Sequence, residues 1–409
     1  MNTDPTHYDV VIVGGGMVGA TMAVALSGQG LSIAIVEAFP FRSDQQPSYD
    51  ARSIALAYGS HKIFDAMGVW GDMRDGATAI KKIHISDQGQ FGVTRLDAQQ
   101  EGVSSLGYVI ENRVIGSALM KRLAQCEDVS LLCPAKLESV SYEEQLLKAD
   151  LSVGGEIQTI SARLLVGADG GNSQVRKLLD IDVTRWEYGQ TAVIANVTPS
   201  YAHNNVAYER FTSSGPMALL PMSDGRCSLV LTVRDDNLEE IMALDDNAFL
   251  SILNERFGFR LGRFERCSER HSYPLVMLKT KEHIRSRVAI IGNAAHSLHP
   301  VAGQGFNLGI RDVSVLAELI VAANRDGRDF GSESVLREYV DQRKRDHMRV
   351  IGFTDVLARL FSNELGPLAH VRSKGLFLTD LFPPLKHFLS RRTMGLAGRL
   401  PRLSRGIQL

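Results

Sequence analysis

The chain begins its regular pattern with an unbroken apolar run, Val10 to Val13. Such a run predicts a strand that is buried on both faces of a sheet. A glycine-rich turn follows, and the small-residue stretch MVGATMAVAL then predicts a helix that Gly28 or Gly30 can end. A second apolar run, Ile33 to Val36, stops at Glu37. Together these patterns predict a strand–helix–strand unit at the start of the chain.

Two later apolar runs have the same relation to a turn and a helix. Leu164 to Val166 precedes a turn and the helical pattern QVRKLL, which Ser173 can cap. Val288 to Ile291 precedes a long glycine-rich loop, after which Val313 and Leu316 begin an apolar helical face. Residues 190–275 differ, because short alternating runs are separated by turns such as SSGP and SDGR. This pattern predicts an antiparallel sheet, which residues 78–98 are expected to join.

Composition narrows the class of protein without identifying it. The chain has 409 residues, 44% of them hydrophobic and 22% charged, which is ordinary for soluble globular domains. A net charge of −1 gives no electrostatic reason to expect a nucleic-acid partner. Four cysteines without C-x-x-C spacing argue against a zinc site or a disulfide framework. Acids precede the first apolar run, and no apolar run approaches about 18 residues, so we expect a cytoplasmic protein without a signal peptide or membrane span.

The first turn carries the spacing of a dinucleotide site. Gly14 permits a tight turn, Gly16 lets a pyrophosphate approach the backbone, and Gly19 lets helix and strand pack closely. The phosphates would lie at the helix N-terminus, where free N–H groups favour an anion. Glu37 ends the second strand at a spacing that suits a ribose diol. The unit predicts adenine dinucleotide binding, but it does not distinguish FAD from NAD.

Three motifs together indicate a family. GGGMVG, GADGGNSQVR and GNAAHSLHPVAGQGFNLG occur in the order and spacing of the single-component flavoprotein monooxygenases of the p-hydroxybenzoate hydroxylase type. The segments DARSIAL and ERFTSSGPMALLPMSDGRCSLV further resemble the ubiquinone-biosynthesis hydroxylases within that family. Gly292-Asn293 departs from the Gly-Asp of most members, but this asparagine is common in the ubiquinone branch. The resemblance covers essentially the whole chain.

The resemblance implies an α/β fold. A Rossmann-like FAD-binding domain (1–75, 105–185 and 276–330) would be interleaved with an antiparallel-sheet substrate domain (76–104 and 186–275), and C-terminal helices (331–409) would follow. The sheet would form a roof over the flavin, with residues Leu219 to Met222 as an apolar wall. In that family NAD(P)H has no nucleotide-binding fold of its own, and this chain has no second G-x-G-x-x-G after a strand.

The resemblance also assigns the long glycine-rich loop to the flavin. Gly292 would form the turn, and Asn293 would face the ribitol chain. Pro300 would lie beside the isoalloxazine ring, while Gly303 and Gly305 would keep Cβ atoms out of the space that the ring occupies.

A helix is predicted to begin at Gly305, Phe306 and Asn307, where the family backbone meets the N3 and O2 edge of the ring. Its N-terminal N–H groups and dipole would stabilise the negative charge of reduced flavin, much as an oxyanion hole does.

Four further residues have both a cofactor interpretation and a simpler one. DARSIAL is expected to place Arg52 at a helix start near the flavin, and Arg113 is expected before a helix, near the FAD phosphates. Each could instead be a surface arginine. Asp169 and Gly170 would contact the cofactor in the second motif, although Asp169 could equally form an Asx turn.

The two loop histidines, His296 and His299, are spaced so that they could bind a metal on one helical face. The intervening loop character argues against this, and a packed, hydrogen-bonded histidine is the favoured interpretation for each. His299 near a substrate is the alternative.

The implied reaction needs no catalytic triad. NAD(P)H would reduce FAD, O2 would add to give a C4a-hydroperoxide, and this group would attack the electron-rich ring of a prenylated phenol. A flavin-dependent reductase of isoprenoid double bonds and a flavin-stabilised assembly component remain alternatives. An NAD-dependent dehydrogenase does not account for the second and third motifs.

The C-terminal segment differs in composition from the rest of the chain. From Leu381 to Leu409 it has six Lys or Arg residues and no Asp or Glu, with leucines and phenylalanines between them. Because a prenylated substrate dissolves in lipid, this segment indicates peripheral contact with a membrane surface or a biosynthetic protein complex. The alternative is a C-terminal helix that packs on the FAD domain.

Overall fold

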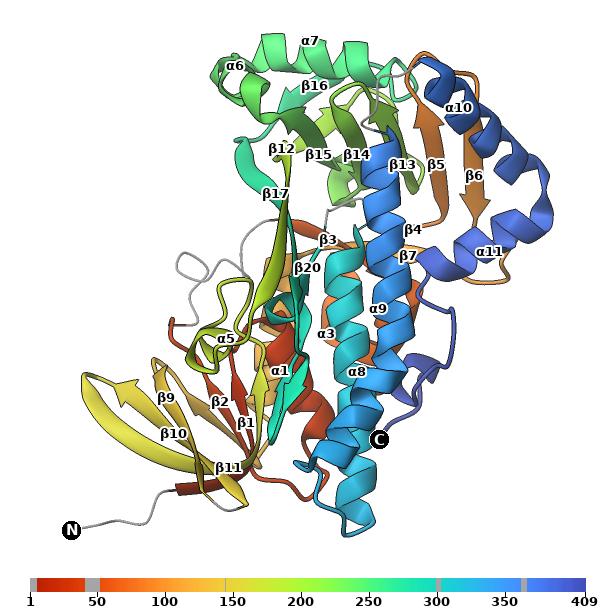
Figure 1. The fold of residues 1–409 in the computed structure, drawn as a ribbon. Coiled ribbons are helices and arrows are strands. Elements are labelled where there is room, and N and C mark those ends of the chain that lie inside the picture. Colours follow the sequence, from red (N-terminus) through yellow and green to blue (C-terminus); the bar gives the residue numbers. More distant parts are fainter. Residues whose placement is uncertain (1–5, 41–51, 144, 299–302, 362–365) are drawn as a thin grey trace.

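Two sheets joined by long helices form the body of the protein (Figure 1). The computed structural model describes residues 6–40, 52–143, 145–298, 303–361 and 366–409. The first sheet has the order β18-β19-β11-β1-β2-β8, with β1 parallel to both β11 and β2. The strands on this path are β1 (Thr6–Val13), β2 (Ile33–Val36), β8 (Val129–Leu132), β11 (Glu156–Gly167), β18 (Ile284–Arg285) and β19 (Val288–Ile290). Two further strands, β9 (Lys136–Glu143) and β10 (Leu146–Val153), extend the sheet from β11. Parallel pairing explains why the four predicted apolar runs have no polar face.

Helices cover one face of this sheet and a hairpin covers the other. The helical layer consists of α1 (Met17–Leu26), α4 (Asn112–Leu123), α8 (Gln304–Arg325) and α9 (Glu333–Phe361). Helix α1 has apolar or small side chains all round and is almost fully buried, so it can pack between the sheet and α8. The opposite face packs against β9, β10 and α5 (Gln174–Leu178).

The second sheet lies above the first in Figure 1 and has the order β20-β17-β12-β15-β14-β13-β5-β6, with β16 beside β12. Its strands are β5 (Lys82–Asp87), β6 (Val93–Asp97), β12 (Val183–Pro199), β13 (Val206–Thr212), β14 (Gly215–Pro221), β15 (Cys227–Arg234), β16 (Phe264–Cys267), β17 (His271–Thr280) and β20 (His296–Ser297). Helices α6 (Leu238–Ala243) and α7 (Asp246–Phe257) cover its outer face. Residues 78–98 supply β5 and β6, as predicted.

A small sheet, β3-β7-β4, lies between the two large ones, next to short helices. It consists of β3 (Ser53–Ala57), β4 (Ala77–Ile80) and β7 (Gly107–Glu111), and the helices are α2 (Tyr58–Ala66) and α3 (Trp70–Met73). The prediction that Arg52 lies at a helix start is therefore wrong, because it directly precedes strand β3. Five residues of β3 pair with β7, so a partner distant in sequence decides their conformation.

The fold class predicted from the sequence is confirmed, including the C-terminal helices α10 (Gly366–Leu381) and α11 (Pro383–Thr393). Helix α10 packs on β6 and β5 of the second sheet. The last residues return to the helical layer, where the short 3-10 helix η7 (Leu403–Arg405) packs on α2 and α8. The alternative of a tail that packs on the FAD domain is therefore correct for this end of the chain and wrong for α10. The exact boundaries given for the three units stay predictions.

Candidate functional site

The glycine turn after β1 is as tight as the sequence requires. Gly14 has φ +102°, and a Cβ there would lie 2.6 Å from the carbonyl oxygen of Ala168. A Cβ on Gly19 would lie 1.9 Å from the carbonyl oxygen of Gly14, so helix α1 can pack here only without a side chain. Helix α1 begins after Gly16 with no capping side chain and no acid in its first turn. Its first N–H groups are thus suited to an anion such as a pyrophosphate.

Glu37 lies beside this turn at the end of β2 and is 7% exposed. Its Oε2 accepts a hydrogen bond from the Gly15 N–H at 2.6 Å, and its Oε1 accepts one from the Phe39 N–H at 2.8 Å. These bonds fix the carboxylate next to the glycine turn. Each carboxylate oxygen can accept a second hydrogen bond, so the group can still bind a ribose hydroxyl.

The second motif packs directly against the first. One oxygen of Asp169 accepts hydrogen bonds from the N–H groups of Gln174 and Val175, and Ser173 accepts one from Arg176. Both side chains therefore cap α5, which supports the local interpretation of Asp169. Its other oxygen, Oδ1, is buried and has no partner in the described part of the chain. Gly170 has φ +79°, and no atom lies within 4 Å of where its Cβ would be.

The third motif begins with a turn against α1. Gly292 has φ +60°, and a Cβ there would lie 3.0 Å from a methyl group of Val18. A Cβ on Gly309 of α8 would lie 3.1 Å from the Gly292 Cα. The turn is therefore held between two helices, and Asn293 remains exposed beside the start of α1. Pro300 and His299 lie outside the described residues.

Asn307 connects the first turn of α8 to β3. Its Oδ1 accepts from the Ala57 N–H, and its Nδ2 donates to the carbonyl oxygens of Ala55 and Gly303, with distances of 2.8, 2.8 and 2.7 Å. The side-chain amide thus pairs with the edge of β3 as a neighbouring strand would. These bonds occupy both donors of the Asn307 amide and fix the first turn of α8 against β3. Contact of this turn with a cofactor ring stays a prediction.

The helix begins at Gln304, one residue earlier than predicted, after Gly303 in the left-handed conformation at φ +59°. A Cβ on Gly303 would lie 3.0 Å from the Ala55 Cβ, whereas a Cβ on Gly305 would meet no atom within 4 Å. The described part of the chain therefore gives no steric reason for a glycine at 305. Phe306 stacks near Phe64, with ring centroids 6.5 Å apart, and is partly buried in the helical core.

The two predicted arginines lie at the border of the small sheet. The guanidinium of Arg52 lies over the ring of Tyr273 in β17, 4.8 Å from its centroid, and so reaches the second sheet. Arg113 is the second residue of α4, not a residue before it, and its Nε forms an ion pair with Glu111 Oε2. Arg226 lies 3.8 Å from the other Glu111 oxygen. Their contact with a cofactor stays a prediction.

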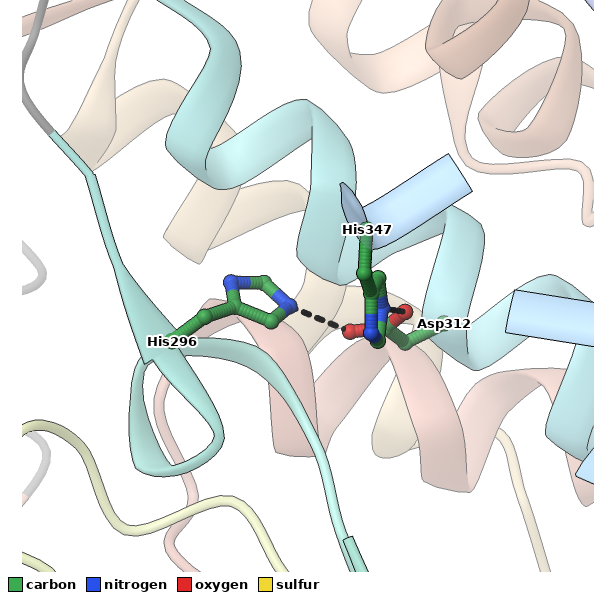
Figure 2. A group of neighbouring side chains, drawn as sticks. All are labelled: His296, Asp312 and His347. Atoms are coloured by element: carbon green, nitrogen blue, oxygen red, sulfur yellow. Dashed lines mark hydrogen bonds and ion pairs between the residues drawn. The ribbon is translucent and has the colours of Figure 1, made fainter. Parts of the chain in front are cut away.

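A buried group beside the third motif is the one place in the described chain where histidine and acid atoms gather closely enough to suggest a metal (Figure 2). His296 comes from β20, Asp312 from α8 and His347 from α9. The two histidine Nε2 atoms lie 2.7 and 2.6 Å from different oxygens of Asp312, which are hydrogen-bonding distances. Arg343 Nε donates to the same carboxylate at 2.7 Å.

These contacts favour a hydrogen-bonded ion network over a metal site. Each Nε2 atom that would bind an ion instead faces a carboxylate oxygen, and a guanidinium already neutralises Asp312. Burial alone would raise the pKa of Asp312, but His347 and Arg343 outweigh it and hold that pKa well below its usual range. The network ties β20, immediately before the predicted flavin loop, to α8 and α9. The favoured prediction of a packed, hydrogen-bonded His296 is confirmed.

The face of the second sheet that meets the small sheet is partly apolar. Leu220 and Met222 pack with Ala207 of β13 and Ala55 of β3 in one cluster. Leu219 points to the opposite face and packs under α7. The apolar wall predicted from Leu219 to Met222 is therefore only half correct, because alternate residues of a strand face opposite sides.

Glu209 is a residue of this face that the sequence did not single out. It lies between Ala207 and Phe211 in the alternation of β13 and pairs with Ala218 of β14. Burial raises the pKa of its carboxyl to about 7. The sequence signal that could have identified Glu209 is the alternation in VAYERFT, which places one acid among the apolar positions of one face.

Comparisons with known proteins agree with this geometry. The family model for the FAD binding domain matches residues 7–354. Ubiquinone hydroxylase UbiL of Rhodospirillum rubrum is 39% identical over 98% of this chain and 93% of its own length. The human mitochondrial ubiquinone biosynthesis monooxygenase COQ6 is 33% identical over 93% of this chain and 91% of its own length. The crystal structure of p-nitrophenol 4-monooxygenase PnpA from Pseudomonas putida DLL-E4 superposes with a TM-score of 0.80 at 19% identity, over 97% of this chain and 99% of PnpA, and supports the fold alone.

The chain belongs to the FAD-binding family of flavoprotein monooxygenases, and within it to the branch that contains the ubiquinone hydroxylases. The described residues fit FAD. An uncapped helix start follows the glycine turn, Asp169 Oδ1 is buried without a partner, and a Cβ at Gly305 would enter open space.

Proposed function

We propose that the protein is an FAD-dependent monooxygenase that hydroxylates the ring of a prenylated phenol in ubiquinone biosynthesis. The specific step that we assign is that of a 2-octaprenyl-6-methoxyphenol hydroxylase. The overall reaction consumes the phenol, O2, NAD(P)H and a proton, and yields the hydroxylated ring, NAD(P)⁺ and water. One oxygen atom enters a ring C–H bond, and the other leaves as water.

The observation that carries the proposal is the meeting of the third motif with the apolar face of the second sheet. Gly303 and Asn307 contact Ala55, and Ala55 packs in one cluster with Leu220 and Met222. This arrangement would bring an apolar ring close to the loop that the family uses for the flavin. An apolar lining would also exclude water from the place where oxygen would be transferred.

The remaining roles follow from the residues already described. The start of α1 would bind the pyrophosphate, Glu37 the ribose, and Asn293 the ribitol hydroxyls. The uncapped first turn of α8 would stabilise negative charge on the pyrimidine edge of the reduced ring. Bound FAD supplies the oxygen-activating chemistry, which no protein side chain can provide.

Glu209 is the residue to which we assign a proton transfer. A phenol becomes a better nucleophile when it loses its proton, and a base with a pKa near the working pH transfers protons efficiently. The Glu209 carboxyl shares the face of β13 with Ala207, and burial raises its pKa to about 7. In its charged form it would accept the phenol proton.

Mass spectrometry of prenylated lipids from cells that lack the protein tests the assigned step. We expect the prenylated methoxyphenol to accumulate and to disappear when the gene is restored. Accumulation of another ring intermediate would move the hydroxylation to a different carbon. A prenyl chain with altered saturation would favour the isoprenoid reductase instead.

A further inference from the structure

Helices α10 and α11 expose an unusual number of large apolar side chains on one side of the molecule. Phe377, Leu378, Leu381, Phe382, Leu385 and Phe388 are between 42% and 60% exposed. Val371 and Phe91 extend this set, and the ring centroids of Phe91 and Phe377 lie 5.9 Å apart. We call these eight side chains the α10–α11 face. Single exposed apolar residues are common, but a continuous group marks a surface that another body covers.

The inner side of α10 is polar, which is the reverse of an ordinary surface helix. The Gly92 N–H donates to Ser373 Oγ at 2.9 Å, and Thr94 Oγ1 donates to the Leu376 carbonyl at 2.8 Å. The Arg95 N–H donates to Asp380 Oδ1 at 2.9 Å.

A nearly buried ion pair, Arg372 Nε to Asp87 Oδ2 at 3.1 Å, adds to these contacts. A Cβ on Gly92 would lie 2.0 Å from the Ser373 carbonyl oxygen, so α10 lies directly on the end of β6. The helix is therefore fixed through polar groups, and its apolar residues are left pointing outward.

Charge indicates what covers this face. Asp380 is the sole acid between residues 371 and 409, and it faces inward to Arg95 and Lys386, at 3.2 and 3.0 Å. Lys374 and Arg391 are exposed, and the Arg392 guanidinium lies 4.2 Å from the centre of the Phe388 ring. A surface of leucine and phenylalanine with excess cations matches an anionic lipid bilayer, where rings enter the acyl boundary and cations meet the headgroups.

We propose that the α10–α11 face docks the enzyme onto the surface of an anionic bilayer. This inference rests on the proposed function, since a prenylated phenol dissolves in lipid. None of the described helices has the length and apolar content to cross a bilayer, so the two helices would lie in its surface plane. Because α10 lies on β6, the edge strand of the second sheet, docking would bring this edge to the lipid that holds the substrate.

The test compares two matched triple variants of the full-length, FAD-loaded protein. Leu378→Glu, Phe382→Glu and Phe388→Glu together change the α10–α11 face. Ile157→Glu, Tyr201→Glu and Phe259→Glu change three equally exposed apolar side chains elsewhere and add the same charge. Sedimentation with phosphatidylcholine vesicles, with and without phosphatidylglycerol, measures binding.

We expect the unaltered protein and the control variant to sediment with the anionic vesicles, and the face variant to lose about tenfold or more in binding. High salt should weaken binding of the unaltered protein. Equal sedimentation of both triple variants, or no sedimentation of the unaltered protein, would overturn the proposal. So would a dimer that the face variant alone dissociates while vesicle binding persists, because a second copy would then cover the face.

A water-soluble short-chain phenol separates this inference from the proposed function. The face variant should hydroxylate it at the unaltered rate, and should lose activity only on substrate embedded in vesicles. If the unaltered protein binds vesicles but hydroxylates neither substrate, the proposed function fails while docking stands.

Discussion

At the scale of single residues, the glycines of the site are explained in two different ways. At Gly14 and Gly19 the backbone of the protein itself occupies the space of a side chain. At Gly305 nothing in the described chain does. This difference separates glycines that the fold requires from one that a bound ring requires.

Substituting these two kinds of glycine should give opposite results. Gly305→Leu should leave the free energy of unfolding of the FAD-free protein within about 1 kcal/mol, because leucine is a good helix former. It should weaken FAD binding by more than about tenfold. Gly19→Ala should destabilise the FAD-free protein by about 2 kcal/mol or more, because its Cβ meets the Gly14 carbonyl.

Urea unfolding and flavin fluorescence titration measure the two quantities. Unchanged FAD affinity of the Gly305→Leu protein would show that the first turn of α8 does not face the ring.

Glu209 gives a prediction about pH. Since the pKa of its carboxyl is raised to about 7, the charged base forms as the pH rises through that value. We expect kcat/KM for a phenol to rise across this range, and Glu209→Gln to remove that rise and to lower activity at pH 8 by about 100-fold. Glu265→Gln, at an exposed position of β16, is the matched control. An identical pH profile in the Glu209→Gln enzyme would exclude Glu209 as the base.

The same shift affects stability with a definite sign. Between the ordinary value of 4.5 and about 7, the folded protein keeps a proton that the unfolded chain releases. Stability therefore falls as the pH rises through this window. Glu209→Gln should remove that fall, which makes the variant relatively more stable at pH 8 in urea unfolding.

At the scale of elements, α8 connects the parts of the site. Its first turn holds β3 through Asn307, and one turn later Arg311 and Asp312 face α9. On α9, the ion-pair partners are Arg343, Asp346 and His347, and together these side chains form a buried network. This network fixes β20 relative to both helices.

Removing the Asp312 carboxylate should strongly destabilise the folded protein. Asp312→Asn leaves the buried Arg343 without its main counter-charge and should lower the free energy of unfolding by about 3 to 5 kcal/mol. Glu333→Gln, which breaks an exposed pair on α9, should cause no measurable change. Urea unfolding at pH 7 compares them. An Asp312→Asn protein as stable as the unaltered chain would mean that the network is not charged as described.

Acid should weaken the same network. Because the pKa of Asp312 is held below its ordinary 3.8, the stability it contributes is present above that value and is lost as the pH falls further. The ring of His283 lies next to this network, with its centroid 4.9 Å from that of His347, and burial lowers the pKa of His283 to about 3. Between 6.5 and about 3 the unfolded chain gains a proton at His283 that the folded protein does not, so stability falls as the pH falls.

At the scale of the whole molecule, local patterns predicted the framework and its cofactor motifs. The first strand–helix–strand unit, the strand before each glycine turn and the antiparallel region could all be predicted because each is encoded in a pattern of neighbouring residues. Apart from the joining of residues 78–98 to the antiparallel sheet, contacts between distant segments could not be predicted. β3 was expected to be helical because its partners, β7 and Asn307, lie far along the chain.

The face of the sheet to which each side chain points could not be predicted either, because it depends on segments distant in the sequence. Leu219 and Leu220 differ in which layer they face, and only the packing of α7 decides it. The basic and apolar C-terminal composition was visible in the sequence, but the outward direction of the apolar side chains on α10 depends on the polar contacts of this helix with β6.

Oxygen incorporation by the purified, FAD-loaded protein tests the central claim most directly. The protein would be supplied with NADH or NADPH, the prenylated methoxyphenol in lipid vesicles, and isotopically labelled O2. We predict that the ring product carries a single labelled oxygen atom and that NAD(P)H is consumed in equal amount. Consumption of NAD(P)H that yields only hydrogen peroxide, or an oxygen atom derived from water, would contradict the account.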